Sequence, residues 1–222
     1  MKTAGNLMAV ETARRINSIC VFGGAEEGRE PSVLAAAHQL GREIALAGMR
    51  LVYGGGSGGI MGAVAKGAAA ANGAIVSITP NFLLEGLCHV EGRPQVIAVP
   101  DMHTRKRLMF DYADAFVAMP GGIGTIEEMA EVLTWRKLKQ HAKPLLLANI
   151  TGFWSPWLTL LSHLETAGLM SSDVNQSLLV SSEVAEILPL LRHAAGEIEE
   201  DHYAWFEEAI DASGGFFSAP NP

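Results

Sequence analysis

Short apolar runs alternate with stretches of helical pattern along most of the chain. The runs are apolar at successive positions instead of at every second one, which is typical of strands covered by helices on both faces. They occupy residues 18–22, 50–53, 74–78, 96–99, 115–119, 145–148 and 178–180. Because this alternation is the sequence mark of βα units, we predict an α/β fold. We expect it to be Rossmann-like and doubly wound, with a mainly parallel sheet of about seven strands and helices on both faces.

Helical patterns with recognisable ends fill the spaces between these runs. Pro31 opens one helix and Gly48 follows its end, in agreement with the preference for proline in the first turn and glycine after the last. The predicted helices are 31–47, 59–71, 102–113, 125–138 and 156–167. The last three flank the polar motifs described below.

Composition sets the boundaries of the folded unit. A chain of 222 residues has the size of one domain with extensions, and residues 17–194 carry the alternating pattern. Residues 1–16 lack the apolar stretch of a signal peptide and are predicted to be flexible. Residues 195–222 begin acidic and aromatic, and we expect an amphipathic helix and tail there that dock Trp205, Phe206 and Ile210 on the body or on a partner subunit.

Charge and hydropathy exclude several classes of partner. Hydrophobic residues make up 49% and charged residues 18% of the chain, enough to bury a sizeable core. The net charge of −8 argues against a nucleic-acid partner, and no apolar run approaches the roughly 20 residues that span a membrane. The two cysteines, Cys20 and Cys88, lack metal-ligand spacing. We therefore expect a cytoplasmic protein without a metal or a cofactor.

Three glycine clusters each follow an apolar run, at the sheet edge where doubly wound folds bind ligands. They lie at 23–24, 54–59 and 121–124. Glycine lets backbone N–H groups approach an anion, and a following helix adds positive potential at its N-terminus. We therefore expect a phosphate-bearing ligand, with Gly55, Gly56 and Ser57 among its contacts. A tight structural turn is the alternative for the second cluster, whose spacing does not match a P-loop.

The segment 119–135 combines more features than packing requires. A buried run leads into a Pro-Gly-Gly turn, Thr125 stands at the predicted helix start, and Glu127 and Glu128 fall in the predicted first turn. Acidic residues at that place stabilise a helix by about 0.3–1 kcal/mol, which explains the two glutamates but not the complete string. We interpret the segment as a functional site.

Two motifs resemble those of a known family. Residues 120–128, Pro-Gly-Gly-Ile-Gly-Thr-Ile-Glu-Glu, resemble the PGGxGTxxE signature of the LONELY GUY (LOG) family, once called lysine decarboxylase-like, and Met102-His-Thr-Arg-Lys106 resembles a second family element. The similarity extends from about Ile19 to Leu169. It implies a homodimeric enzyme that hydrolyses the N-glycosidic bond of nucleoside 5′-monophosphates, such as AMP or cytokinin riboside monophosphates.

The same resemblance implies roles for individual residues. Arg105 and Glu128 fill the catalytic positions of the family. The substrate-contact positions fall at Glu85, Lys106, Gly121, Gly122, Ile123, Gly124, Thr125, Ile126, Glu127 and Thr134.

The chemistry can also be argued from the residue types. Breaking a C1′–N bond builds positive charge on the ribose, so a nearby carboxylate stabilises the transition state. We expect Glu128 to do this and to activate water while Glu127 holds ribose hydroxyls, although the two roles could be exchanged. Arg105 would neutralise the leaving base or clamp the phosphate. A surface ion pair with Asp101, four residues earlier, is the alternative for Arg105.

Three other functions fit parts of the sequence. Molybdenum-cofactor carrier proteins resemble this architecture and bind phosphate-bearing ligands without cleaving them, but a carrier gains little from carboxylates beside its phosphate. A lysine decarboxylase needs a Schiff-base lysine, and neither Lys66 nor Lys106 lies in a recognisable cofactor motif. The acidic balance weighs against a DNA-processing protein. We expect His103 to face solvent or cap its helix, and Trp135, Trp154 and Trp157 to pack between helices or subunits.

Overall fold

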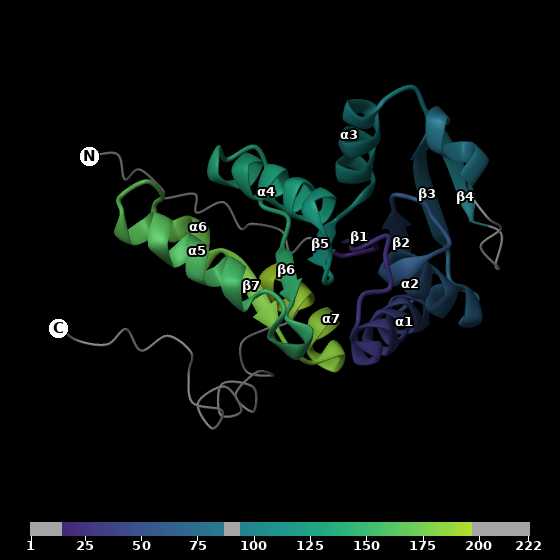
Figure 1. Ribbon diagram of the computed structural model, residues 1–222, viewed down its shortest axis with the longest axis horizontal. Coiled ribbons are helices and arrows are strands. Elements are labelled where there is room, and N and C mark those ends of the chain that lie inside the picture. The colour runs from purple at the N-terminus through teal and green to yellow at the C-terminus, as the bar shows by residue number, and fades with distance from the viewer. Residues whose placement is uncertain (1–14, 87–93, 197–222) are drawn as a thin grey trace, which may run out of the picture.

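The computed structural model describes residues 15–86 and 94–196 and contains one sheet of seven parallel strands (Figure 1). The order across the sheet is β4-β3-β2-β1-β5-β6-β7. The strands are β1 Ser18–Phe22, β2 Arg50–Tyr53, β3 Ile75–Pro80, β4 Gln95–Val99, β5 Ala115–Ala118, β6 Leu145–Ala148 and β7 Leu178–Ser181. The predicted α/β, doubly wound fold is confirmed.

Helices cover both faces of this sheet. Figure 1 shows α3 and α4 above the strands and α1, α2 and α7 below them. One layer holds α1 Pro31–Leu46, α2 Gly59–Ala70 and α7 Val184–Ala194. The other holds α3 Met102–Tyr112, α4 Ile123–Lys137, α5 Ser155–Thr166 and the short α6 Ser172–Gln176.

The uninterrupted apolar runs follow from this double cover. In β1, Ile19 and Val21 pack into the core beneath α1 and α2, whereas Cys20 and Phe22 pack beneath α3 and α4. Successive side chains of a strand point to opposite faces, so a strand with helices on both sides needs an apolar residue at every position. The two edge strands depart from this pattern, since most residues of β4 and two of the four residues of β7 are partly or fully exposed.

Two glycines bring α1 and α2 into close contact. A Cβ on Gly41 would lie 1.9 Å from the Val64 carbonyl oxygen, and a Cβ on Gly67 would lie 1.9 Å from that of His38. Glycine inside a helix costs stability relative to alanine, so these positions serve the close approach of the two backbones. This packing fixes the N-terminus of α2 at the carboxyl edge of the sheet.

The chain changes face between β1 and β5. The helix after β1 covers one face and the helix after β5 the other, and the two strands are neighbours. In open α/β sheets such a switch point opens a crevice at the carboxyl ends of the strands. Here the two loops are joined, since the Gly24 N–H donates to the Pro120 carbonyl oxygen at 3.0 Å.

The structure corrects one helix boundary that matters for the site. The sequence pattern predicts a start at Thr125, but α4 begins at Ile123, because the extended Gly122 directly after the Pro-Gly turn is its N-cap (φ −88°, ψ −158°). The prediction that Glu127 and Glu128 lie in the first turn is therefore wrong, and they lie in the second. The α6 and α7 helices and the 3₁₀ turns η1 Asn81–Gly86 and η2 Ile150–Gly152 were not predicted.

Some predictions fall outside the described residues. They are the flexible N-terminus up to residue 14 and the C-terminal amphipathic helix with Trp205. Within the described ranges, Cys20 is a buried free cysteine. No helix of those ranges combines the length and the apolar character needed to cross a bilayer.

Candidate active site

A cavity of about 580 Å³ opens at the switch point. Its walls are the loop after β1 (residues 23–30), the turn after β5 (residues 120–122), the first turns of α4, the η2 segment and the starts of α1, α2 and α3. Small-molecule sites usually measure about 300–1,000 Å³. The cavity is therefore large enough for a nucleotide, and it is the candidate active site.

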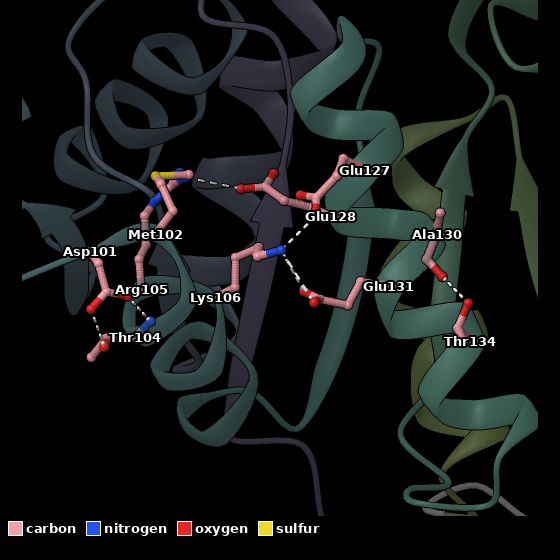
Figure 2. Close-up of polar contacts among 10 residues, drawn as sticks. All are labelled: Asp101, Met102, Thr104, Arg105, Lys106, Glu127, Glu128, Ala130, Glu131 and Thr134. Carbon is pink, nitrogen blue, oxygen red and sulfur yellow. Dashed lines mark hydrogen bonds and ion pairs between the residues drawn. The ribbon is translucent and has the colours of Figure 1, made fainter.

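Arg105 and Glu128 meet at one side of this cavity. Nη1 of Arg105 lies 3.2 Å from Oε1 of Glu128, and both side chains are largely buried. Figure 2 shows Arg105 reaching from α3 and Glu128 from α4. The alternative ion pair with Asp101 is not formed, because that carboxylate caps α3 and accepts hydrogen bonds from the backbone N–H and the hydroxyl of Thr104.

Gly54 makes room for the guanidinium of Arg105. A Cβ at Gly54 would lie 1.7 Å from Nη2 of Arg105, so a side chain there would displace the arginine. The glycine loop after β2 thus seats Arg105 in this structure. The three residues of this loop that were predicted as ligand contacts, Gly55, Gly56 and Ser57, do not line the cavity.

The turn after β5 is built around a buried threonine. A Cβ on Gly121 would lie 2.1 Å from Oγ1 of Thr125 and 2.8 Å from the Gly24 nitrogen, whereas Gly122 and Gly124 have open space beside them. The first hydrogen bond of α4 runs from the Ile126 N–H to the Gly122 carbonyl oxygen at 3.1 Å. The N–H groups of residues 123–125 therefore have no partner within the helix and give the cavity edge an anion-binding potential.

Lys106 is held by two carboxylates of α4. Its Nζ donates to Oε1 of Glu127 and lies 3.1 Å from Oε2 of Glu131. In Figure 2 the lysine points from α3 toward both glutamates. Only 12% of the Lys106 side chain is exposed, against 53% for Glu127. The ammonium group thus fixes Glu127 at the cavity, while Lys106 is not among the lining residues.

Burial changes the acidity of Glu128. It raises the pKa of the carboxyl from the usual 4.5 to about 6, while the positive charge of Arg105 lowers this pKa and the negative charge of Glu127 raises it. A carboxyl group in an apolar environment resists ionisation, because its charged form loses hydration there. At neutral pH, Glu128 is still mainly ionised but takes up a proton more readily than an exposed glutamate.

The predicted site residues divide into two groups in the structure. Those that line the cavity are Arg105, Gly121, Gly122, Gly124, Thr125, Glu127 and Glu128. Those of the described residues that do not line it include Lys106, Ile123, Ile126 and Thr134. The Ile123 side chain is 83% exposed. The Glu85 backbone lies in η1, but its side chain is outside the described part of the structure.

Thr134 lies apart from the other predicted contacts. Its hydroxyl donates to the Ala130 carbonyl oxygen at 2.7 Å, on an exposed part of α4. Figure 2 shows it farther along the helix than Glu127 and Glu131. Thr134 lies seven positions after Glu127 on α4, about 10 Å farther along the axis.

Sequence reasoning missed Glu131, Thr151 and Phe153. Glu131 follows Glu127 by four residues, a spacing that places two side chains on one helix face, so this signal was available. Thr151 and Phe153 line the cavity from η2 and the residue after it. Nothing in their residue types points to a ligand, and only the conformation of the η2 turn brings them to the cavity.

Trp154, Trp135 and His103 do not line the cavity. Trp154 is buried and donates from Nε1 to the Ala118 carbonyl oxygen at 3.0 Å, and Trp135 packs edge-on against Phe110. His103 is exposed to solvent. In the described ranges, histidine, cysteine and acidic side chains do not gather in any group of three that could hold a metal ion.

Comparisons with known proteins identify the family. The family model described as "Possible lysine decarboxylase" matches residues 61–191. The cytokinin riboside 5′-monophosphate phosphoribohydrolase LOG of Oryza sativa subsp. japonica is 37% identical over 191 residues, which are 85% of this chain and 78% of that protein. The enzyme LOG7 of Arabidopsis thaliana is 37% identical over 190 residues, 86% of this chain and 88% of its own length. The chain belongs to the LOG family. Since these relatives are phosphoribohydrolases by name, this LOG-family protein is an enzyme of that class.

Solved structures place the LOG-family chain in a wider fold group. The molybdenum cofactor binding protein of Rippkaea orientalis superposes with a TM-score of 0.61 at 27% identity, covering 81% of this chain and 97% of that one. The Moco carrier protein of Chlamydomonas reinhardtii gives a TM-score of 0.64 at 22% identity, with 83% and 100% covered. Proteins of different function share this fold, so the function of the LOG-family chain has to be argued from its site.

Proposed function

We propose that this LOG-family enzyme hydrolyses the N-glycosidic bond of purine and cytokinin nucleoside 5′-monophosphates, releasing the free base and ribose 5-phosphate. The observation that carries the proposal is the buried Arg105–Glu128 pair beside the anion-binding start of α4, both at one cavity. A phosphate and a ribose each find matching groups there.

The 5′-phosphate binds at the start of α4. The free N–H groups of residues 123–125 and the positive end of the helix attract an anion, and Gly122 and Gly124 leave their backbone open to it. The hydroxyl of Thr125 lies in the same turn. This placement brings the ribose next to Glu127 and Glu128, one turn farther along the helix.

The two glutamates then act on the ribose. Glu127 is half-exposed at the cavity and held by Lys106, so it accepts hydrogen bonds from the ribose hydroxyls. Glu128 stabilises the positive charge that develops on the ribose and orients the attacking water. The water oxygen bonds to C1′ as the C1′–N bond breaks, the bonding electrons leave with the base, and the water proton reaches the base by way of Glu128.

Arg105 supports this step as a fixed cation. It keeps Glu128 ionised by lowering the pKa of its carboxyl and supplies positive charge beside the reacting bond. The set of groups is complete for a hydrolysis that uses neither a metal nor a cofactor.

We also propose that the enzyme acts as a cytoplasmic homodimer, without a nucleic-acid or membrane partner. The net charge of −8 supports the exclusion of nucleic acid. The position of Thr134 supports the dimer, because this predicted substrate contact lies on an exposed part of α4 outside the cavity of its own chain. A second protomer packed on α4 would bring it to a cavity.

The experiment that tests the proposed reaction is a product analysis. The purified protein is incubated with AMP and with isopentenyl-adenosine monophosphate, and the products are separated by chromatography. Equimolar free base and ribose 5-phosphate support hydrolysis. Tight nucleotide binding without either product supports instead a carrier, as for the molybdenum-cofactor proteins of the same fold.

A further inference from the structure

One wall of the cavity is formed by the segment that follows β6. Thr151 and Phe153 line the cavity there, and Arg105 and Glu128 line it from α3 and α4. Phe153 is 44% exposed, although a phenylalanine is normally buried. Its position has to be explained by something other than the packing of the core.

The backbone around Phe153 is held in an unusual turn. Thr151 has a φ of +56° and Gly152 a φ of +75°, and a left-handed backbone is rare for a β-branched residue. Two hydrogen bonds close the turn, from the Gly152 N–H to the Asn149 carbonyl oxygen (3.0 Å) and from the Phe153 N–H to that of Ile150 (3.1 Å). Strained backbone of this kind clusters at functional sites.

A buried tryptophan supports the phenylalanine from behind. The rings of Phe153 and Trp154 meet edge to face with centroids 5.0 Å apart. Two hydrogen bonds fix Trp154. Its indole N–H donates to the Ala118 carbonyl oxygen, and its backbone N–H donates to Oδ1 of Asn149 at 2.7 Å. Ala118 ends β5, the strand that leads into the turn at Pro120. The aromatic pair is thus anchored to the strand that carries the candidate catalytic motif.

The chemistry of this wall differs from that of the rest of the cavity. Val33 and Ile60 are apolar lining residues, and Phe153 is the one aromatic side chain among the described lining residues. Phosphate and ribose require N–H groups and charged side chains, which the cavity offers at α4 and in the loop after β1, where Glu26, Glu27, Arg29 and Glu30 line it. A flat base requires an apolar or aromatic surface, because stacking on a ring buries its faces.

We infer that Phe153 is the platform on which the nucleobase stacks, and that Thr151, Gly152 and Trp154 hold it ready for that contact. The inference rests on the proposed function, since it assigns the base of the same nucleotide to the wall that Thr151 and Phe153 form. It makes Phe153 a specificity-determining residue. The affinity for ligands that carry a base depends on Phe153, and the affinity for ribose 5-phosphate does not.

The test compares two ligands that differ by the base. Binding of AMP and of ribose 5-phosphate is measured by calorimetry in a Glu128→Gln background, which prevents turnover during the titration. Phe153→Ala is expected to weaken AMP binding at least fivefold, which is the lower end for loss of one base–aromatic stack. The affinity for ribose 5-phosphate should change by no more than about twofold. Phe153→Tyr keeps a ring and is expected to restore AMP binding. The matched control is Leu169→Ala, an exposed apolar residue outside the cavity lining.

The outcomes separate this inference from the proposed reaction. Unchanged AMP affinity in Phe153→Ala overturns the stacking role. An equal loss of affinity for AMP and for ribose 5-phosphate also overturns it, because such a loss indicates a distorted turn. If the unmodified enzyme releases no base but Phe153→Ala still weakens AMP alone, the stacking role stands and the proposed hydrolysis fails.

Discussion

Nη1 of Arg105 lies 3.2 Å from Oε1 of Glu128, and this contact joins two motifs that belong to different helices. The pair is buried at the cavity edge, where neither charge is well hydrated. The charge of Arg105 lowers the pKa of Glu128 and so favours the ionised form of this carboxyl. The expected behaviour of the enzyme follows largely from this contact and from the groups that hold the pair in place.

Gly54→Ala should reduce turnover without unfolding the protein. The new Cβ would lie 1.7 Å from Nη2 of Arg105, so the guanidinium must leave Glu128. A misplacement of about 1 Å costs up to about 100-fold in rate, and we expect a loss of kcat of at least tenfold. Steady-state kinetics and a melting curve measure the two effects.

Gly58→Ala is the matched control for that substitution. Its Cβ would meet only the Ala25 carbonyl oxygen at 3.7 Å, an ordinary contact, and the backbone there does not have a positive φ. This variant should keep both kcat and the melting temperature. Equal activity in the two variants would show that the space beside Gly54 is unimportant for the position of Arg105.

The activity should depend on pH through Glu128. Because the carboxyl acts in its ionised form and its pKa is raised to about 6, kcat should rise as pH increases from about 5 to 7 and then level off. Replacing Arg105 removes a charge that lowers this pKa. The pH at which the residual activity of Arg105→Ala rises should therefore be higher than for the unmodified enzyme. A kcat that is flat or falling from pH 5 to 7 would rule out this use of the carboxylate.

The same pKa shift predicts a change in stability. Between pH 4.5 and about 6 the folded chain keeps a proton on Glu128 that the unfolded chain has lost, so stability falls as pH rises through this window. The shift corresponds to about 2 kcal/mol. Relative to the unmodified protein, Glu128→Gln should therefore gain up to that amount of unfolding free energy between pH 4.5 and 6.5. Urea titrations at several pH values test this, and parallel pH profiles of the two proteins would contradict it.

Glu131→Gln should weaken substrate binding more than turnover. Lys106 then keeps only Glu127 as a charged partner and draws its carboxylate away from the ribose. We expect KM for the nucleotide to rise about three- to tenfold, or roughly 0.7–1.4 kcal/mol, with a smaller change in kcat. Glu43→Gln, which alters a surface pair with Arg42, should leave KM unchanged. A lower kcat with the original KM would assign Glu131 to the chemical step instead.

The strands were predictable because the double cover of the sheet imposes an apolar residue at nearly every position, as in β1 and β6. The start of α4 was misplaced because the extended backbone of Gly122, which sets it, leaves no clear mark in the sequence. The glycine loop after β2 was expected to contact an anion, and its first residue seats an arginine instead. That role depends on where α3 lies, which local sequence does not determine.

The aromatic wall was beyond sequence reasoning for a related reason. The position of Phe153 follows from the left-handed backbone of Thr151, and threonine is not a residue that suggests such a turn. By contrast, the four-residue spacing of Glu127 and Glu131 could have revealed their common face. Their shared partner Lys106 depends on the packing of α3 against α4 and could not be foreseen.

The most direct test of the central claim is release of free base from AMP by the unmodified enzyme and by Arg105→Ala and Glu128→Ala. Arg107→Ala is the matched control, because Arg107 lies on the same helix but is exposed and pairs with Asp111. We predict equimolar base and ribose 5-phosphate from the unmodified enzyme and from the control, and a loss of at least about 100-fold in the other two variants. Equal base release from all four proteins, or none from the unmodified enzyme, would contradict the account.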